Sequence, residues 1–487
     1  MGKIAPDHRL VALFCTLAAI RVLIYCAAFP FFNNVDESMH FDLVMKYGQG
    51  HIPRSLETMS PDSAAYIALF ATPEYLRKPG DFRANRIPLP LARDYDGLVT
   101  GWSSRVNYES LEPPGYYAVA GIWENLGSFL GLNGGWILYW IRFLNVFLAA
   151  ALVWIAYLAA SEVFPENRFI VLGVPLLAAI LPQDTYYSIQ SDVLSPLCFG
   201  IVFVSMARFI RADVPSLERA VLTGLALAAT TLVKSSNLPV LAVAMVAVLF
   251  KMHRLRRARK LSPAAVPIGM FALCALAPVF GWFAWNLSTQ GDLTATAAKI
   301  QMFGWTHKPW YAWFHHPIFT PGGAWIFWSE LMASFWRGEF VWWGARLAMP
   351  AADAFYWGSS LVFVALATIG LRRETDDFRR QMSWFAFGSF AALVIFMGLL
   401  SVSFDFGRCF YPSQQHPYFT SGRLVSAALI PFLLLYVRGL DRAISWIKSE
   451  RSRFCILAVI ALFVTGSEII INQPAFASRY NLFHLLR

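Results

Sequence analysis

The sequence has little charge. Only 14% of its 487 residues are Asp, Glu, Lys or Arg, while 57% are hydrophobic. Soluble globular chains carry roughly 25% charged residues. This shortage excludes an ordinary soluble domain and predicts an integral membrane protein. The net charge of +10 does not indicate nucleic-acid binding, because the positive residues fall in loops between apolar runs.

Several patterns of other protein classes are missing. The six cysteines have no CxxC spacing and mostly lie in apolar runs, which argues against a disulfide framework or a cysteine-based metal site. There is no nucleotide-binding glycine motif. No internal repeat is visible, so the inverted-repeat architecture of secondary transporters gains no support. The first apolar run has no secretory cleavage pattern, and we expect it to be retained as a span.

Eleven apolar runs predict membrane crossings, which need about 20 apolar residues, or fewer where the helix packs inside a bundle. The pair between residues 219 and 250 is short. The predicted spans cover residues 10–31, 136–160, 168–182, 192–210, 219–233, 237–250, 264–286, 351–371, 382–403, 421–437 and 454–471.

The distribution of Lys and Arg predicts the orientation of these spans. Four loops on one side of the layout carry 18 of the chain's 40 Lys and Arg residues. Cytoplasmic loops are enriched in positive residues. The N-terminus is therefore predicted to be cytoplasmic and the C-terminus to lie outside. Short cytoplasmic loops without a retention signal favour a bacterial inner membrane.

Two long segments are predicted on the outer side, residues 32–135 and residues 287–350. The second contains the aromatic runs "FGWTHKPWYAWFHHP" and "FWRGEFVWWGARLAMP". Such runs are typical of short helices at the bilayer interface. They fit an interfacial belt and also a groove wall for a lipid-linked substrate. Residues 1–487 are predicted to form one transmembrane domain.

The first outer segment opens with "NNVDESMHFDLVMKYGQG". A solvated helix start would explain its carboxylates, which suit the first turn of a helix. A carboxylate near the apolar boundary can also accept a proton from a hydroxyl. Asp36 and Glu37 are therefore candidate catalytic residues. His40 would orient them, and Asp42, on another helix face, is expected to matter little.

A second outer motif, "VNYESLEPPGYYAVAGIW", covers residues 106–123. Its two prolines predict an extended turn before an amphipathic helix. Glu109 and Tyr117 are placed where they can face the first motif. We consider both as supporting residues of a site, beside the alternative of a structural turn.

Two further candidates lie at the outer ends of middle spans. Asp192, in "SIQSDVLSPL", stands at a span end, where helix capping is the default role. Lys234 is the sole charge between Ala220 and Phe250. An ionisable residue in such a run is costly and points to function. Its ammonium either meets a phosphate or extends to the interface along its apolar stem.

The segment "RCFYPSQQHPYFTSGRLVSAALIP" supplies the last candidates. His416 and Arg423 stand at the outer ends of the ninth and tenth spans. The planar guanidinium of Arg423 suits an anionic headgroup, although interfacial arginines are also common without such a role. All these groups are predicted at one membrane face.

This arrangement resembles the GT-C superfamily of membrane glycosyltransferases, which includes aminoarabinose transferases, protein O-mannosyltransferases and bacterial enzymes that use polyprenyl-phosphate sugars. The resemblance covers nearly the whole chain. In "SGRLVSAALIP", Leu424 stands where an aromatic residue is usual and Ser426 stands where a proline is usual. The motifs that carry it are "VDESMHFDLVMKYGQGHIP", "YESLEPPGYYAV", "SIQSDVLSPL" and "SGRLVSAALIP".

The resemblance implies a GT-C-like bundle of about eleven helices and an inverting transfer of a hexosyl or pentosyl group. The donor would be a polyprenyl-phosphate sugar, and the acceptor a glycan, lipid or protein. Asp36 would be the catalytic carboxylate, and Lys234 and Arg423 would bind the donor phosphate, with His416 as a further candidate. No metal ligands are predicted, and a requirement for a divalent cation such as Mg²⁺ or Mn²⁺ stays open.

Three other functions are compatible with parts of the sequence. A polysaccharide polymerase or ligase acting on diphosphate-linked substrates would be expected to rely on Arg and His rather than on a first-loop acidic pair. A secondary transporter would place its charges near the bilayer midplane. A non-catalytic membrane scaffold would need none of these side chains.

Overall fold

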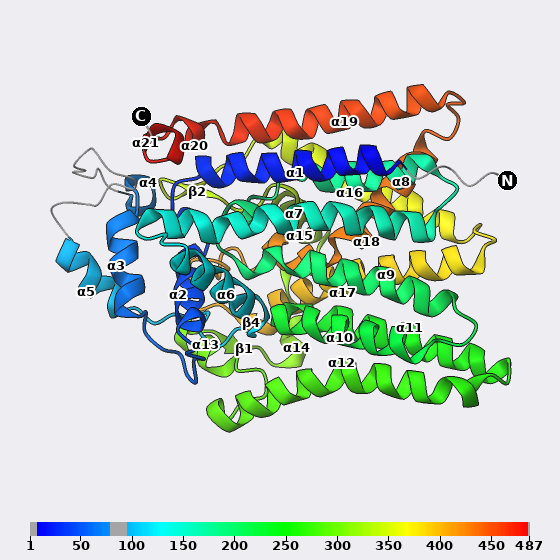
Figure 1. The fold of residues 1–487 in the computed structure, drawn as a ribbon, viewed down its shortest axis with the longest axis horizontal. Helices are drawn as coiled ribbons and strands as arrows, with labels where there is room; N and C mark the ends of the chain where they lie inside the picture. The colour runs from blue at the N-terminus through cyan, green and yellow to red at the C-terminus, as the bar shows by residue number, and fades with distance from the viewer. Residues whose placement is uncertain (1–6, 78–94, 486–487) are drawn as a thin grey trace.

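The computed structural model describes residues 7–77 and 95–485, most of which are helical. Long helices lie side by side in one bundle (Figure 1). A helix coincides with each of the eleven predicted spans. These helices are α1 His8–Ala28, α7 Gly135–Val163, α8 Arg168–Ala179, α9 Ser195–Arg211, α10 Leu217–Val233, α11 Leu238–Arg257, α12 Leu261–Gln290, α16 Pro350–Leu371, α17 Asp377–Ser403, α18 Leu429–Ala443 and α19 Glu450–Ile471.

The predicted all-α membrane fold is confirmed. Within residues 7–77 and 95–485, nine helices are long and apolar enough to cross a membrane. Two of the nine reach this length only together with the 3-10 residues before them, Ser191–Arg211 with α9 and Gly422–Ala443 with α18. The other two helices at predicted spans have 12 residues in α8 and 17 in α10. Of the uncertain pair near 219–250, only α10 is short, because α11 continues through its positive segment to Arg257.

α8 covers residues 168–179 of the third predicted span, and the segment between the third and fourth predicted spans is irregular. α8 ends at Ala179, and the chain continues through two short 3-10 helices, η1 Asp184–Tyr187 and η2 Ser191–Val193. Irregular backbone at membrane depth needs protein partners for its polar groups. Asn145 provides two of them, since its Nδ2 donates to the carbonyls of Tyr186 and Ser188 at 3.1 and 2.8 Å.

The first predicted outer segment forms a cap at one end of the bundle. Figure 1 shows the short helices α2 to α6 at this end, near the C-terminus, with the N-terminus at the opposite end. The first segment contains α2 Glu37–Gly48, α3 Pro61–Phe70, α4 Pro73–Leu76, α5 Tyr95–Ser103 and α6 Gly115–Phe129. The second contains α13 Ala297–Met302, β1 Thr306–His307, α14 Trp310–Trp313, η4 Pro317–Phe319, α15 Pro321–Arg337, β2 Val341–Trp342 and β3 Ala345–Arg346.

Strands contribute little among the described residues. β1 pairs antiparallel with β4 Phe404–Asp405, so that Thr306 faces Asp405, and β2 pairs with β3. The remaining short helices are η3 Ser235–Asn237, η5 Gly422–Ala428, α20 Gln473–Ala477 and α21 Leu482–Leu485. α15 is longer than the short interfacial helices expected, and it buries Leu331 and Trp336 in the core.

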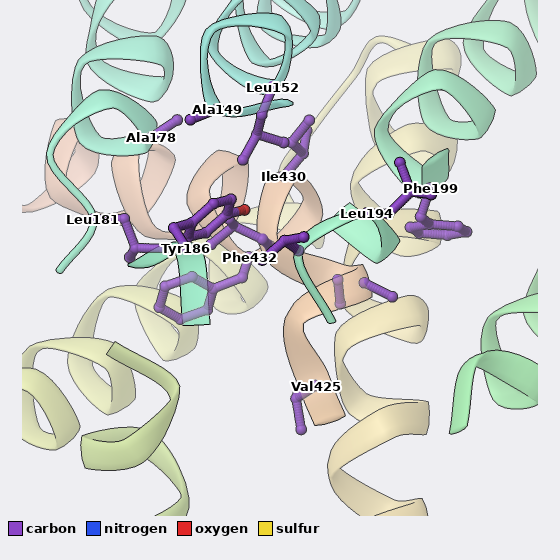
Figure 2. Packing of buried hydrophobic residues seen from close by; sticks show 14 of the residues in the cluster. Ala149, Leu152, Ala178, Leu181, Tyr186, Leu194, Phe199, Val425, Ile430 and Phe432 are labelled. Atoms are coloured by element: carbon purple, nitrogen blue, oxygen red, sulfur yellow. The ribbon is translucent and has the colours of Figure 1, made fainter. Parts of the chain in front are cut away.

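The apolar core lies where the central helices meet. Figure 2 shows Leu152 of α7, Phe199 of α9 and Phe432 of α18 among its side chains. These residues are at most 2% exposed. η5 runs directly into α18, so the packing of α18 also fixes the outer end from which Arg423 extends.

The predicted layout places Arg257 and the C-terminal end of the chain on opposite sides of the membrane. A reporter fused after Arg257, at the end of α11, is expected on the cytoplasmic side, because the adjacent loop is rich in Lys and Arg. A reporter fused to the C-terminal end is expected outside. Alkaline phosphatase and green fluorescent protein fusions measure both positions. The same side for both would contradict the layout.

Candidate active site

Asp36 directly precedes α2 and has a left-handed backbone, with φ of 67°. Tyr108 donates a hydrogen bond to its Oδ1 at 2.5 Å, and Arg423 forms an ion pair with its Oδ2. Burial raises the pKa of this carboxyl, but the charge of Arg423 and the Tyr108 hydrogen bond outweigh burial and hold the pKa below its ordinary value. Asp36 is therefore an ionised carboxylate held between two donors.

Glu37, the next residue, faces α7 instead. Its two carboxylate oxygens accept hydrogen bonds from Nε and Nη2 of Arg142, each at 2.7 Å. They also accept the backbone N–H of Phe32 at 2.8 Å and of Ile189 at 3.0 Å. With four donors and no exposed surface, Glu37 is placed as a structural anchor of α2. This geometry does not favour the predicted role as an acidic partner of Asp36.

His40 contacts another predicted site residue. Its Nδ1 lies 2.7 Å from the hydroxyl of Tyr117 in α6. Burial, together with the charges of Lys234 and Arg423, lowers the pKa of His40 to about 4 against the opposing effect of Glu109 and Asp36. The imidazole is thus neutral near pH 7.

Asp42 is more constrained than the sequence suggests. It is fully buried and accepts the backbone N–H of Ser60 and the side-chain amide of Asn107, both at 2.8 Å. Lys46 Nζ lies 3.0 Å from it. The prediction that Asp42 matters little concerns the reaction and stays a prediction, whereas for the fold these bonds join α2 to the segments around it.

Two carboxyl groups of the second motif share one cation from the second outer segment. Lys299 Nζ lies 2.9 Å from Glu109 Oε1 and 3.7 Å from Glu112 Oε1. Burial and the neighbouring charge of Glu109 raise the pKa of Glu112 to about 7. Burial also acts to raise the pKa of Glu109, but the charge of Lys299 outweighs it and the pKa lies well below its ordinary value. At neutral pH the pair is therefore only partly ionised.

Lys234 does not extend to the surface. Its Nζ lies 2.6 Å from Asp192 Oδ2, and both residues are buried. Asp192 Oδ2 is in turn 3.8 Å from Nη1 of Arg423. The two predicted cations therefore meet at one shared carboxylate.

Arg423 is the centre of the cluster. Besides Asp36 and Asp192, its Nε lies 3.8 Å from Oε2 of Glu339. Its position depends on Gly422, because a Cβ there would come within 2.0 Å of the backbone N of Phe335 in α15. Only glycine permits this close approach of η5 to α15.

The cluster keeps polar atoms available for a ligand. Among the described residues, buried atoms with no hydrogen-bond partner include His40 Nε2, Ser110 Oγ, Asp192 Oδ1 and Ser236 Oγ. Buried polar atoms in folded proteins are nearly always paired. Asp192, whose other carboxylate oxygen contacts Lys234, and His40 therefore keep hydrogen-bonding capacity that a polar substrate can use.

The structure brings together most of the predicted site residues, but not His416. Its Nε2 lies 2.7 Å from Glu330 Oε2, in a separate cavity beside α15. Sequence reasoning missed Tyr108, Lys299 and Glu339. All three lie in the outer segments, and sequence spacing carries no signal for which distant residues such segments contact.

No metal-binding cluster is found within residues 7–77 and 95–485, where no three His, Cys, Asp or Glu side chains are arranged to hold an ion. Asp36, Asp192 and Glu339 each have a cationic partner within 2.7 Å.

The sequence matches a known protein family. The family described as "Predicted membrane protein (DUF2142)" matches residues 20–409. The chain belongs to the DUF2142 family. A search of curated proteins finds no match.

Solved structures similar to this DUF2142 protein are glycosyltransferases of the GT-C type. ArnT from Cupriavidus metallidurans, bound to undecaprenyl phosphate, has a TM-score of 0.48 and 10% identity over 99% of this chain and 75% of that chain. An oligosaccharyltransferase of Archaeoglobus fulgidus with Zn and sulfate has a TM-score of 0.47 and 12% identity over 94% of this chain. AglB from Archaeoglobus fulgidus, with an inhibitory peptide and a dolichol-phosphate, has a TM-score of 0.47 and 11% identity over 95% of this chain.

These similarities concern the arrangement of helices, because the sequences share so few residues. The chain spans only 53% and 56% of the two archaeal proteins.

The Glu37–Arg142 contact predicts a large loss of stability when one partner is removed. Glu37→Gln leaves the buried guanidinium of Arg142 uncompensated, which typically costs about 3–5 kcal/mol. We expect a clearly lowered temperature of thermal aggregation for the purified protein in detergent.

Glu162→Gln provides the matched control. Glu162 pairs with Arg208 and Arg211, whose side chains are each 48% exposed, and such surface pairs contribute about 0–1 kcal/mol. A Glu37→Gln protein that is as stable as this control but inactive would contradict the structural role and return Glu37 to the reaction.

Proposed function

We propose that this DUF2142 protein is an inverting glycosyltransferase. It moves a hexosyl or pentosyl group from a polyprenyl-phosphate donor to an acceptor at the outer face of a bacterial inner membrane. The observation that carries the proposal is the partly buried contact of Asp36 with Arg423, beside the buried Lys234–Asp192 pair, at the end of the apolar bundle where α2 lies.

The leaving group of such a donor is a phosphate monoester of the lipid. Charge on its oxygens grows as the bond to the sugar C1 breaks, and fixed cations in a partly dry site stabilise that charge. Arg423 and Lys234 supply two cations that share Asp192. The guanidinium of Arg423 can bind two phosphate oxygens at once, whereas Lys234 acts as a point charge.

Asp36 is proposed as the general base. A phosphate bound at Arg423 competes with Asp36 for the guanidinium, which is the charge that now lowers the pKa of this carboxyl. Donor binding therefore raises the basicity of Asp36. The carboxylate then takes the proton of the acceptor hydroxyl, the acceptor oxygen bonds to C1, and the electron pair of the C1–O bond leaves with the polyprenyl phosphate.

The supporting residues act on this geometry. Tyr108 orients Asp36, and the neutral His40, held by Tyr117, leaves Nε2 for a sugar hydroxyl. Glu109 and Lys299 shape the side of the site nearest the second motif. Glu37 contributes by fixing the start of α2.

The first test is Asp36→Asn, which removes the base while nearly preserving its shape. Loss of a general base typically lowers the rate about 10²–10⁴-fold. Purified protein is incubated with a panel of polyprenyl-phosphate sugars, and the release of free polyprenyl phosphate is measured. Donor binding is expected to survive, because the phosphate contacts come from other residues.

Asp213→Asn, at a site 90% exposed, is the control and should match the wild type. Wild-type rates for Asp36→Asn would remove Asp36 from the mechanism. They would also favour an enzyme that relies on Arg and His, as expected for diphosphate-linked substrates.

The second test is Lys234→Met, which keeps an apolar stem and deletes the charge. The donor KM should rise and kcat should fall, because leaving-group charge increases towards the transition state. Asp192 loses its partner in this variant, so the double variant Lys234→Met with Asp192→Asn restores charge balance in case the single variant folds poorly. Unchanged kinetics in either folded protein would make Lys234 a structural residue only.

A further inference from the structure

A cavity lies beside the proposed catalytic cluster. It has a volume of about 380 Å³ and is lined by polar and aromatic side chains of α15, the start of α16, β3 and the segment before η5. The residues on which the argument depends are Glu330, Arg346, Trp357, Tyr411 and His416. Neither the reaction at Asp36 nor the phosphate contacts use this cavity.

The side chains of this cavity are held in place by one another. Glu330 Oε2 lies 2.7 Å from His416 Nε2 and accepts the hydroxyl of Thr420 at 3.1 Å. The guanidinium of Arg346 stacks on the ring of Tyr411, with 4.4 Å between them. Fixed carboxylate acceptors and guanidinium donors can bind hydroxyl groups, which both donate and accept. Together with the ring of Trp357, this lining suits a saccharide.

Glu339 connects the cavity to the catalytic cluster. Its Oε1 lies 2.7 Å from Nη2 of Arg346, and its Oε2 lies 3.8 Å from Nε of Arg423. The opposite end of the Arg423 guanidinium, Nη1, lies 3.8 Å from Asp192, the partner of Lys234. The cavity and Lys234, the other proposed phosphate-binding cation, are therefore on different sides of Arg423.

An inverting displacement needs such a separation. The acceptor oxygen must approach C1 from the face opposite the departing phosphate. If the phosphate is held at Lys234 and Arg423, the acceptor must enter from the side of Glu339. The 380 Å³ cavity opens on that side.

An apolar groove along α16 and α17 lies next to the cavity, because Trp328 lines the groove and the following residue, Ser329, lines the cavity. It has a volume of about 440 Å³ and includes Trp328, Leu361 and Ala365. Trp328 directly precedes Ser329 of the polar cavity, and its Nε1 donates to the carbonyl of Trp357 at 3.2 Å. Leu361 lies one helical turn further into the bundle than Trp357. A polar cavity beside an apolar groove suits an amphipathic ligand, with its polar part in the cavity and its hydrocarbon part in the groove.

We propose that the cavity and groove together bind the acceptor and that this acceptor is a saccharide carried on a lipid. Its sugar residues lie among Glu330, Arg346 and Trp357, and its hydrocarbon chain lies in the groove between α16 and α17. This inference rests on the proposed function, because it assigns the second substrate of the same reaction.

The test separates turnover with water from transfer to the acceptor. Full-length protein receives a polyprenyl-phosphate sugar alone, and release of free polyprenyl phosphate reports hydrolysis. An organic-solvent extract of the source membrane, which contains its lipid-linked saccharides, is then added as the acceptor probe. In a parallel arm, the probe is the water-soluble saccharide fraction released from the same extract by mild acid.

In the wild type, the intact extract should stimulate release at far lower concentration than the soluble fraction. Trp357→Leu and Glu330→Gln should raise the half-saturating concentration of both probes about tenfold or more, since about 1.4 kcal/mol of lost contact corresponds to a factor of ten. Ala365→Trp, which fills the groove, should raise it for the intact extract only. Hydrolysis without acceptor should stay unchanged in all three variants.

Ala277→Trp is the matched control, an exposed alanine of α12 on another face of the bundle, and it should behave as the wild type. Equal stimulation by both probes, or pocket variants with wild-type saturation, would overturn the proposal. None of these outcomes concerns the use of the donor itself. If the wild type released no polyprenyl phosphate with or without either probe, that result would instead contradict the proposed function.

Discussion

The ion pair between Glu37 and Arg142 is the constraint on which the site depends. Both side chains are at most 1% exposed, and the carboxylate binds the guanidinium through both oxygens. Buried charges are stable only when paired, so this contact fixes the first residue of α2 against α7. The preceding residue, Asp36, then takes a left-handed backbone and contacts Arg423 instead. Two neighbouring carboxylates acquire different roles because their partners differ.

The pairing of buried charges also determines the other contacts around Arg423. Three carboxylates surround Arg423, and Asp36 has the Arg423 guanidinium itself as its cation. Asp192 pairs with Lys234, and Glu339 pairs with Arg346. Because the charges balance locally, the cluster is stable before any substrate binds. An anionic ligand must then compete with resident carboxylates, which favours a ligand that presents several oxygens in one plane to the guanidinium.

The sequence predicts the bundle well because hydropathy is a property of each run by itself. The eleven helices and the positions of Asp36, Lys234 and Arg423 at one end follow from run lengths and from the Lys and Arg loops. What cannot be predicted is how the outer segments meet. Nothing in the spacing of residues pairs Lys299 with Glu109. The adjacency of Glu37 to Asp36 suggests a shared role, but the helix start between them turns the two side chains to different partners.

Arg423 lies between the Lys234–Asp192 pair and the 380 Å³ cavity. This position has a consequence for the order of donor binding and proton transfer. In the structure its guanidinium engages Asp36, so the proposed base is least basic before a donor arrives. A donor phosphate that draws Arg423 towards Lys234 withdraws charge from Asp36 and from Glu339 together. The first effect raises the basicity of Asp36, and the second frees a carboxylate at the boundary of the 380 Å³ cavity. Activation of the base and preparation of the acceptor side are then coupled through one side chain. Such coupling keeps Asp36 a weak base until a donor binds, and it requires no movement of the helices.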